Sequence, residues 1–123
     1  MAIPRAELLV EERSGEPNGG TVLRIVGELD ISTADQLRRA AAPYLSAGGR
    51  LVLDLSQVTF CDSTGLALLV GFHKRLMAAG GGLELYAPVQ RVQHLLTITG
   101  LNRVFVVRAA DDGPAVQAGP AVD

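Results

Sequence analysis

Segments with strand-like patterns alternate with segments of helical periodicity along most of this 123-residue chain. The clearest pair is the short apolar run LVLDL (51–55) and the segment that follows it from residue 66 to residue 77. Successions of strand, helix and strand favour neighbouring parallel strands that are joined by right-handed crossovers. The alternation therefore predicts an α/β fold in which helices flank a mostly parallel sheet.

The predicted order of elements is β-β-α-β-α-β-α-β, in a single domain. The first two strands are separated by the Gly- and Pro-containing loop 13–20, and we expect them to pair as a hairpin, which makes the sheet mixed. The expected strands are 6–12, 21–27, 51–55, 83–87 and 104–107. GELDIST (27–33) is expected to connect the second strand to the first helix.

Several local signals mark the helices. Thr33 and Gln36 have the spacing of a capping box at the start of the first helix, and Gly100 is placed to end the third helix in the left-handed conformation. The second helix has an apolar face at a period of 3.6 residues. That face comprises Leu66, Leu69, Val70, His73, Leu76 and Met77.

The charge pattern argues against nucleic-acid binding. The formal net charge is −2, and the adjacent pairs Arg38–Arg39 and Lys74–Arg75 fit solvated helix faces better than a basic stripe. The single cysteine, Cys61, cannot form an intramolecular disulfide and is expected to be a small buried group. The two histidines and one cysteine lack zinc-like spacing, so we expect no metal and no cofactor.

The sequence shows no secretory signal at its N-terminus and no apolar stretch near the roughly 18 residues that span a bilayer. We therefore expect a cytoplasmic protein that does not associate with membranes.

The stretch CDSTG (61–65) lies where a strand is expected to lead into the second helix, at the carboxyl edge of the sheet, where α/β proteins tend to place function. Asp62 or Ser63 is suited to cap the helix. Gly65 costs about 1 kcal/mol relative to Ala inside a helix, which indicates close packing on the sheet or on a partner.

Four roles are open for this stretch. It can be a simple cap, a hydrolase site with Ser63 as nucleophile, a nucleotide site at Asp30, Asp62 and Ser63, or a phosphorylation site. The nucleophile elbow G-x-S-x-G and the P-loop motif are both absent, and His73 and His94 are not evident bases. Phosphorylation fits better, because a phosphate at a helix N-terminus meets free N–H groups and the positive end of the dipole.

Three segments resemble a STAS domain of the anti-sigma factor antagonist type, over about residues 6–108, with 109–123 as a tail outside it. They are GELDISTADQLRRAA (27–41), LVLDLSQVTFCDSTGLALLVGFHKRL (51–76) and GGGLELYAPVQRVQHLLTITGLNRVF (80–105). The most specific feature is the D-S-T-G-L motif (62–66) after the L-V-L-D-L strand (51–55). One departure is Cys61, which stands where the family usually has a larger apolar residue.

The resemblance implies a protein-interaction switch and not an enzyme. Ser63 would be phosphorylated by an anti-sigma factor with serine kinase activity, and a PP2C-type phosphatase would reverse the modification. The unphosphorylated form would bind that anti-sigma factor and free its sigma factor. The implied partner contacts are Asp30, Asp62, Thr64, Gly65, Ala67, Leu68, Gly71 and Arg75. The alternative is a STAS scaffold subunit of a stress-sensing or lipid-transport complex, without a phosphoserine cycle.

Overall fold

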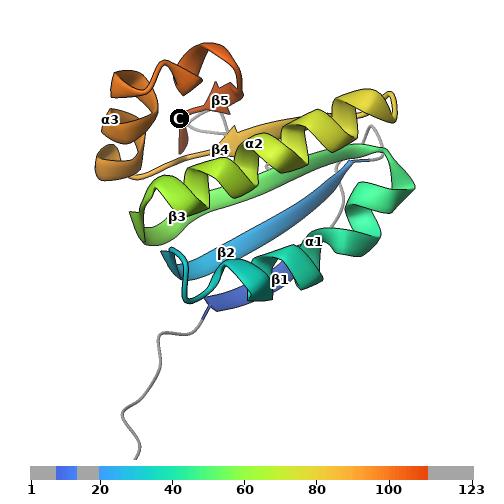
Figure 1. The fold of residues 1–123 in the computed structure, drawn as a ribbon, viewed down its shortest axis with the longest axis horizontal. Helices are drawn as coiled ribbons and strands as arrows, with labels where there is room; N and C mark the ends of the chain where they lie inside the picture. The colour runs from blue at the N-terminus through green and yellow to red at the C-terminus, as the bar shows by residue number, and fades with distance from the viewer. Residues whose placement is uncertain (1–7, 14–19, 111–123) are drawn as a thin grey trace, which may run out of the picture.

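The computed structural model describes residues 8–13 and 20–110 as one mixed sheet with helices packed on it (Figure 1). The elements are β1 (Leu8–Arg13), β2 (Thr21–Leu29), α1 (Ala34–Ala47), β3 (Arg50–Cys61), α2 (Ser63–Ala78), β4 (Gly82–Tyr86), α3 (Gln90–Ile98), the short 3-10 helix η1 (Leu101–Arg103) and β5 (Val106–Arg108). Most of the predicted 13–20 loop and most of the predicted tail lie outside the described residues.

The strands lie in the sheet in chain order, β1-β2-β3-β4-β5. β1 pairs with β2 antiparallel, whereas the pairings of β2 with β3, β3 with β4, and β4 with β5 are parallel. The predicted hairpin and the mixed α/β class are therefore confirmed. β5 begins two residues later than expected, and Gly100 has the predicted left-handed conformation, with φ of 78°.

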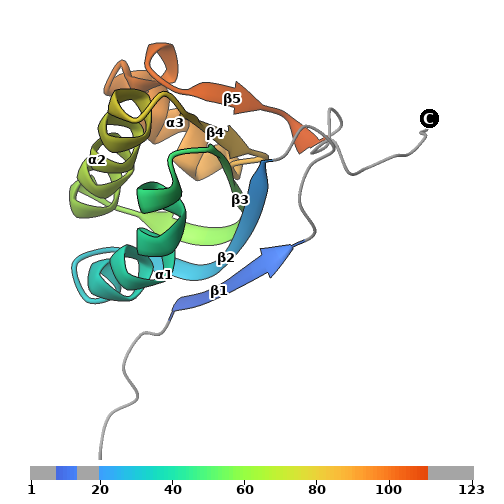
Figure 2. The ribbon, with the colours of Figure 1, turned by 90° about the vertical axis from the view of Figure 1, so that its right-hand side faces the viewer.

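The hydrophobic core lies between the sheet and the helices. α1, α2 and α3 lie on one side of the sheet (Figure 2). Leu51, Leu53 and Leu55 alternate along β3 into this core, and each is at most 1% exposed. Asp54 alternates with them and is also buried, but its carboxylate accepts hydrogen bonds from the N–H and hydroxyl of Ser56, at 3.0 and 2.7 Å. The buried carboxylate is therefore satisfied locally.

Both strands that lead to the predicted site are longer than the sequence suggested. β2 continues into the expected connector as far as Leu29, and β3 continues beyond Leu55 to Cys61. Register shifts between β2 and β3 near Gly27 accommodate the irregular stretch, so this glycine marks a bulge and not the end of the strand. Leu29 pairs with Cys61, and the two chain segments leave the sheet together.

The predicted capping box is wrong. Within the described residues, the Thr33 side chain makes no capping bond to α1; its hydroxyl donates to the Glu28 carbonyl at 2.7 Å and accepts from the Asp30 N–H at 3.1 Å. The Gln36 side chain instead accepts a hydrogen bond from the Leu8 N–H, at 3.1 Å. The Thr33 side chain therefore ties the start of α1 to the end of β2 and the residue after it, whereas the Gln36 side chain ties α1 to β1.

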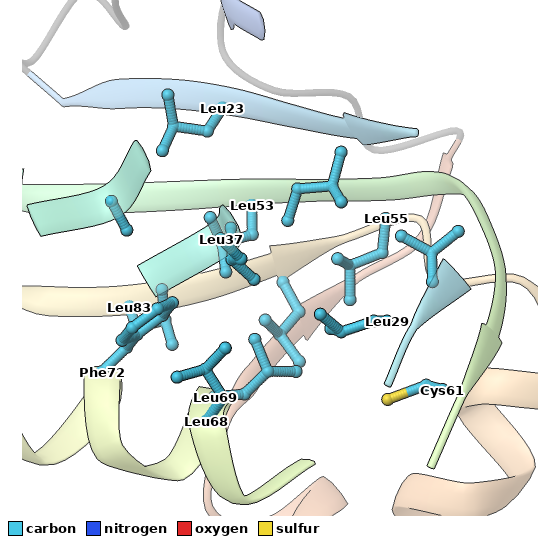
Figure 3. Packing of buried hydrophobic residues seen from close by; sticks show 14 of the residues in the cluster. Leu23, Leu29, Leu37, Leu53, Leu55, Cys61, Leu68, Leu69, Phe72 and Leu83 are labelled. Carbon is cyan, nitrogen blue, oxygen red and sulfur yellow. The ribbon is translucent and has the colours of Figure 1, made fainter. Parts of the chain in front are cut away.

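The buried face of α2 is wider than predicted and rotated. Met77 is 57% exposed, whereas Leu68 and Phe72 are buried along with the expected Leu66, Leu69 and Leu76. The rotation arises because α2 packs on α1 as well as on the sheet (Figure 3). The apolar face of α2 therefore has to cover contacts with both of these neighbours.

Candidate functional site

The site is built around the start of α2, which one residue separates from the end of β3. Asp62 lies between them in an extended conformation and caps the helix: its Oδ1 accepts a hydrogen bond from the Gly65 N–H at 3.1 Å. The Asp62 carbonyl accepts from the Leu66 N–H at 3.0 Å. Of the two capping residues that the sequence allowed, the structure therefore selects Asp62.

Ser63 is the first residue of α2, and it is exposed. Among the described residues, no hydrogen-bond acceptor is recorded for the N–H groups of Ser63 and Thr64, which precede the first intrahelical bond. Thr64, by contrast, is partly buried. The two neighbouring hydroxyls are therefore in different environments, and that of Ser63 is the more accessible.

Gly65 lies against the sheet and not on the surface. A Cβ at this position would lie 2.7 Å from the Leu29 carbonyl oxygen, 2.8 Å from its Cγ and 2.9 Å from the Cys61 sulfur. Leu29 and Cys61 lie near each other where β2 and β3 end (Figure 3). Of the two interpretations of Gly65, packing on the sheet is confirmed, and the buried residue is not an exposed partner contact: the missing side chain lets the first turn of α2 approach the strand ends.

Cys61 is a packing group, as expected. It is 6% exposed, and burial, followed by the negative charge of Asp62, raises its pKa to about 12. The thiol is consequently neutral at physiological pH, and a reactive thiolate is disfavoured.

Asp30 lies at the same edge of the sheet as Asp62. The Asp62 N–H donates to the Leu29 carbonyl at 3.2 Å, so the residues that follow the paired strand ends are held together. The Asp30 carboxylate accepts from the hydroxyl and the N–H of Ser32, at 2.6 and 2.9 Å. The bond from the Ser32 hydroxyl is the main reason why the pKa of Asp30 is lowered. Beside it, Ile31 is 78% exposed, a feature that the sequence reading missed.

A groove between α1 and α2 extends away from Ser63. Its volume is about 310 Å³. The residues that line it are Arg38, Thr64, Ala67, Leu68, Gly71, Phe72 and Arg75. Five of these were predicted as partner contacts, and the structure brings them together; Leu68, only 9% exposed, belongs to the floor of the groove. Arg38 and Phe72 were missed, because the sequence does not show which face of α1 meets α2.

The catalytic alternatives gain no support from the geometry. The His73 ring packs edge-on against Phe105, with 5.6 Å between ring centroids, and His94 is exposed on α3. In the part of the chain that the structure describes, neither histidine bonds Ser63, and no group of three or more His, Cys, Asp or Glu residues is arranged to hold a metal. None of the described helices is both long and apolar enough to cross a membrane.

Comparison with known proteins gives consistent matches. The family model for the STAS domain matches residues 10–112. The chain is 35% identical over 91 residues to the anti-sigma-B factor antagonist of Bacillus subtilis (strain 168), covering 74% of this chain and 84% of that protein.

Solved structures agree with this match. The crystal structure of an anti-sigma factor antagonist from Mycobacterium paratuberculosis has a TM-score of 0.75 and 27% identity, with 85% of this chain and 89% of that chain covered. The phosphorylated form of the Bacillus cell fate determinant SpoIIAA has a TM-score of 0.62 and 22% identity, with 85% and 94% covered. At 22% identity, the similarity to SpoIIAA shows only that the fold is shared.

Proposed function

The chain belongs to the STAS-domain family, and we propose that it is an anti-sigma factor antagonist whose partner binding is switched by phosphorylation of Ser63. The observation that carries the proposal is the exposed Ser63 hydroxyl at the first position of α2, directly after the capping Asp62. The Bacillus subtilis relative is named as an anti-sigma-B factor antagonist and is 35% identical to this chain, which supports the proposal that the chain is an anti-sigma factor antagonist.

In the proposed unphosphorylated state, the start of α2 is part of a docking surface for an anti-sigma factor with serine kinase activity. Asp30, Asp62 and Ser63 provide polar groups at the sheet edge, and Ile31 adds an exposed apolar side chain beside them. The α1–α2 groove continues this surface along the helix. Binding of the anti-sigma factor here would release its sigma factor, so the protein would act by occupancy and not by catalysis.

A phosphate on Ser63 would not unfold α2. It would face the N–H groups of Ser63 and Thr64 at the positive end of the helix dipole. It would also add a charge of about −1.5 to −2 next to the Asp62 carboxylate. Bulk and like-charge repulsion would therefore block docking while the fold stays intact, and a PP2C-type phosphatase would restore the binding form. We therefore propose that the protein acts in the cytoplasm.

The proposal is tested by affinity capture from lysate of the source cells. Wild-type chain, Ser63→Ala and Ser63→Asp serve as baits, and mass spectrometry identifies the bound proteins. We expect an anti-sigma factor with a kinase fold on the wild type and on Ser63→Ala, and its loss on Ser63→Asp. Retention of the same partners by all three baits, or recovery of transporter subunits alone, would instead support the scaffold alternative.

A further inference from the structure

The α1–α2 groove is hollow in the middle, and the packing of the two helices does not account for this hollow. Its α2 wall is a stripe of residues spaced by three and four, from Thr64 to Arg75, about 17 Å long at the helical rise of 1.5 Å per residue. Leu68 and Phe72 form an apolar floor, whereas Ala67 and Gly71 hollow out the middle.

Gly71 is the residue that intramolecular packing leaves unexplained. A glycine inside a helix costs about 1 kcal/mol relative to alanine. The Gly71 backbone is helical and has no positive φ, and a Cβ there would meet no described atom within 4 Å. Gly65, on the same helix, is required because a side chain would clash with Leu29 and Cys61. The space at Gly71 is therefore open, and no described residue fills it.

The charged residues that line the groove are both positive. Arg38 on α1 and Arg75 on α2 both line it. Arg38 has an ion pair with Asp35, which does not line the groove, and no salt-bridge partner is recorded for Arg75 among the described residues. An occupant that pairs with both guanidinium groups must be acidic, and one that fills the hollow at Gly71 must be apolar at its centre.

We propose that this groove binds an acidic amphipathic helix of the anti-sigma factor, with an apolar side chain of that helix over Gly71 and carboxylates at Arg38 and Arg75. The inference rests on the proposed function and gives the partner segment its chemistry. Docking of an amphipathic helix into an apolar groove is a common recognition mode, and a central pocket with a charged rim is typical of energetically dominant contacts.

An acidic partner also agrees with the direction of the proposed switch. Thr64 lies at the groove end next to Ser63, so a phosphate on Ser63 would stand beside the entering acidic segment. Like charges would then oppose docking, and the effect would be screened by salt for exposed groups.

The test uses the anti-sigma factor recovered by wild-type capture, produced as a purified protein, and the full chain, with affinities measured by isothermal titration calorimetry. The double variant Arg38→Glu/Arg75→Glu is compared with Arg39→Glu/Lys74→Glu. The control double variant changes the net charge equally at neighbouring positions that do not line the groove. We expect the first pair to weaken binding on the order of tenfold or more and the control to change it by about twofold or less.

A second pair of variants tests the hollow without changing charge. Gly71→Leu fills the groove, whereas Ala78→Leu adds the same side chain at an exposed position of α2 outside it. Only Gly71→Leu is expected to weaken binding on the order of tenfold, with a thermal unfolding curve that shows the fold is kept.

The results separate this inference from the proposed function. If Ser63→Asp abolishes binding but neither groove variant changes it beyond its control, the antagonist function stands and the groove proposal is overturned. Equal weakening by both charge variants would also overturn it, because net charge alone would then explain the effect. Changes confined to self-association of the chain, seen by sedimentation, would assign the groove to a second copy. Recovery of no anti-sigma factor by the wild type contradicts both proposals.

Discussion

The Oδ1 of Asp62 accepts a hydrogen bond from the Gly65 N–H at 3.1 Å, and the exposed Ser63 lies between these two residues in the chain. The carboxylate stabilises the helix start, and the glycine lets that start rest on the strand ends beneath it. The exposed hydroxyl therefore lies at a capped helix start that packs closely on the strand ends.

Removing the cap should destabilise the protein without removing the hydroxyl. Asp62→Ala leaves the Gly65 N–H without its acceptor, and we expect a loss of about 0.5–2 kcal/mol in the free energy of unfolding. Asp62→Asn keeps an acceptor oxygen and should lose less. Urea unfolding followed by circular dichroism measures both. Equal stability of Asp62→Ala and the wild type would contradict the capping role.

The two glycines of α2 should respond to alanine in opposite directions. Gly65→Ala forces a methyl group into the Leu29 carbonyl and the Cys61 sulfur, so it should lower stability. Gly71→Ala meets no described atom and should raise stability by up to about 1 kcal/mol. Thermal and urea unfolding of the two variants provide the measurement. A stabilising Gly65→Ala would show that α2 does not rest closely on the strand ends.

The Thr33 side chain should stabilise the backbone between Glu28 and Asp30 more than it stabilises α1. Its hydroxyl is buried and bridges the Glu28 carbonyl and the Asp30 N–H. Thr33→Val keeps the shape but leaves both groups unsatisfied, at a cost of about 1–3 kcal/mol, whereas Thr33→Ser keeps the hydroxyl. Hydrogen exchange should show faster exchange of the Asp30 amide in Thr33→Val only. Unchanged exchange there would disprove the bridge.

The buried Cys61 predicts a specific alkaline instability. Its pKa is raised from 9.0 to about 12 in the folded protein, so the folded state retains a proton that the unfolded state has lost between these values. This contribution to stability is complete below pH 9 and is lost as the pH rises toward 12. The free energy of unfolding should therefore fall more steeply over this window for the wild type than for Cys61→Ala. Parallel pH profiles of the two proteins would refute the prediction.

The sequence revealed the fold class because its signals were local and repeated. Strand and helix periods alternate, and the hairpin, the parallel pairings and the left-handed Gly100 follow as expected. Its errors arose from contacts that the local pattern does not show. The Thr33 hydroxyl bonds to the backbone of the preceding Glu28 and Asp30, and the Gln36 side chain accepts from Leu8 on β1. β3 continues to Cys61, where it pairs with Leu29 of β2.

The sequence predicted where the candidate residues lie in the fold, but not how deeply each of them is buried. Asp62 and Ser63 occupy the expected junction, and the α2 contacts lie together in one groove. The sequence left open whether Gly65 packs on the sheet or on a partner, since a glycine gives no sign of which way its missing side chain would point. Arg38 and Ile31 were missed because only the packing of α1 and the course of the loop before it reveal them.

The central claim, that Ser63 is the switch, is tested most directly by phosphorylating the chain with the captured anti-sigma factor and Mg-ATP. Tandem mass spectrometry locates the phosphate, and calorimetry compares the binding of the modified and unmodified chains. We predict one phosphoryl group on Ser63, none on Ser63→Ala, normal modification of Thr64→Ala, and loss of binding after modification. A phosphate on Thr64 alone, or a Ser63-phosphorylated chain that binds as tightly as the unmodified one, would contradict the account.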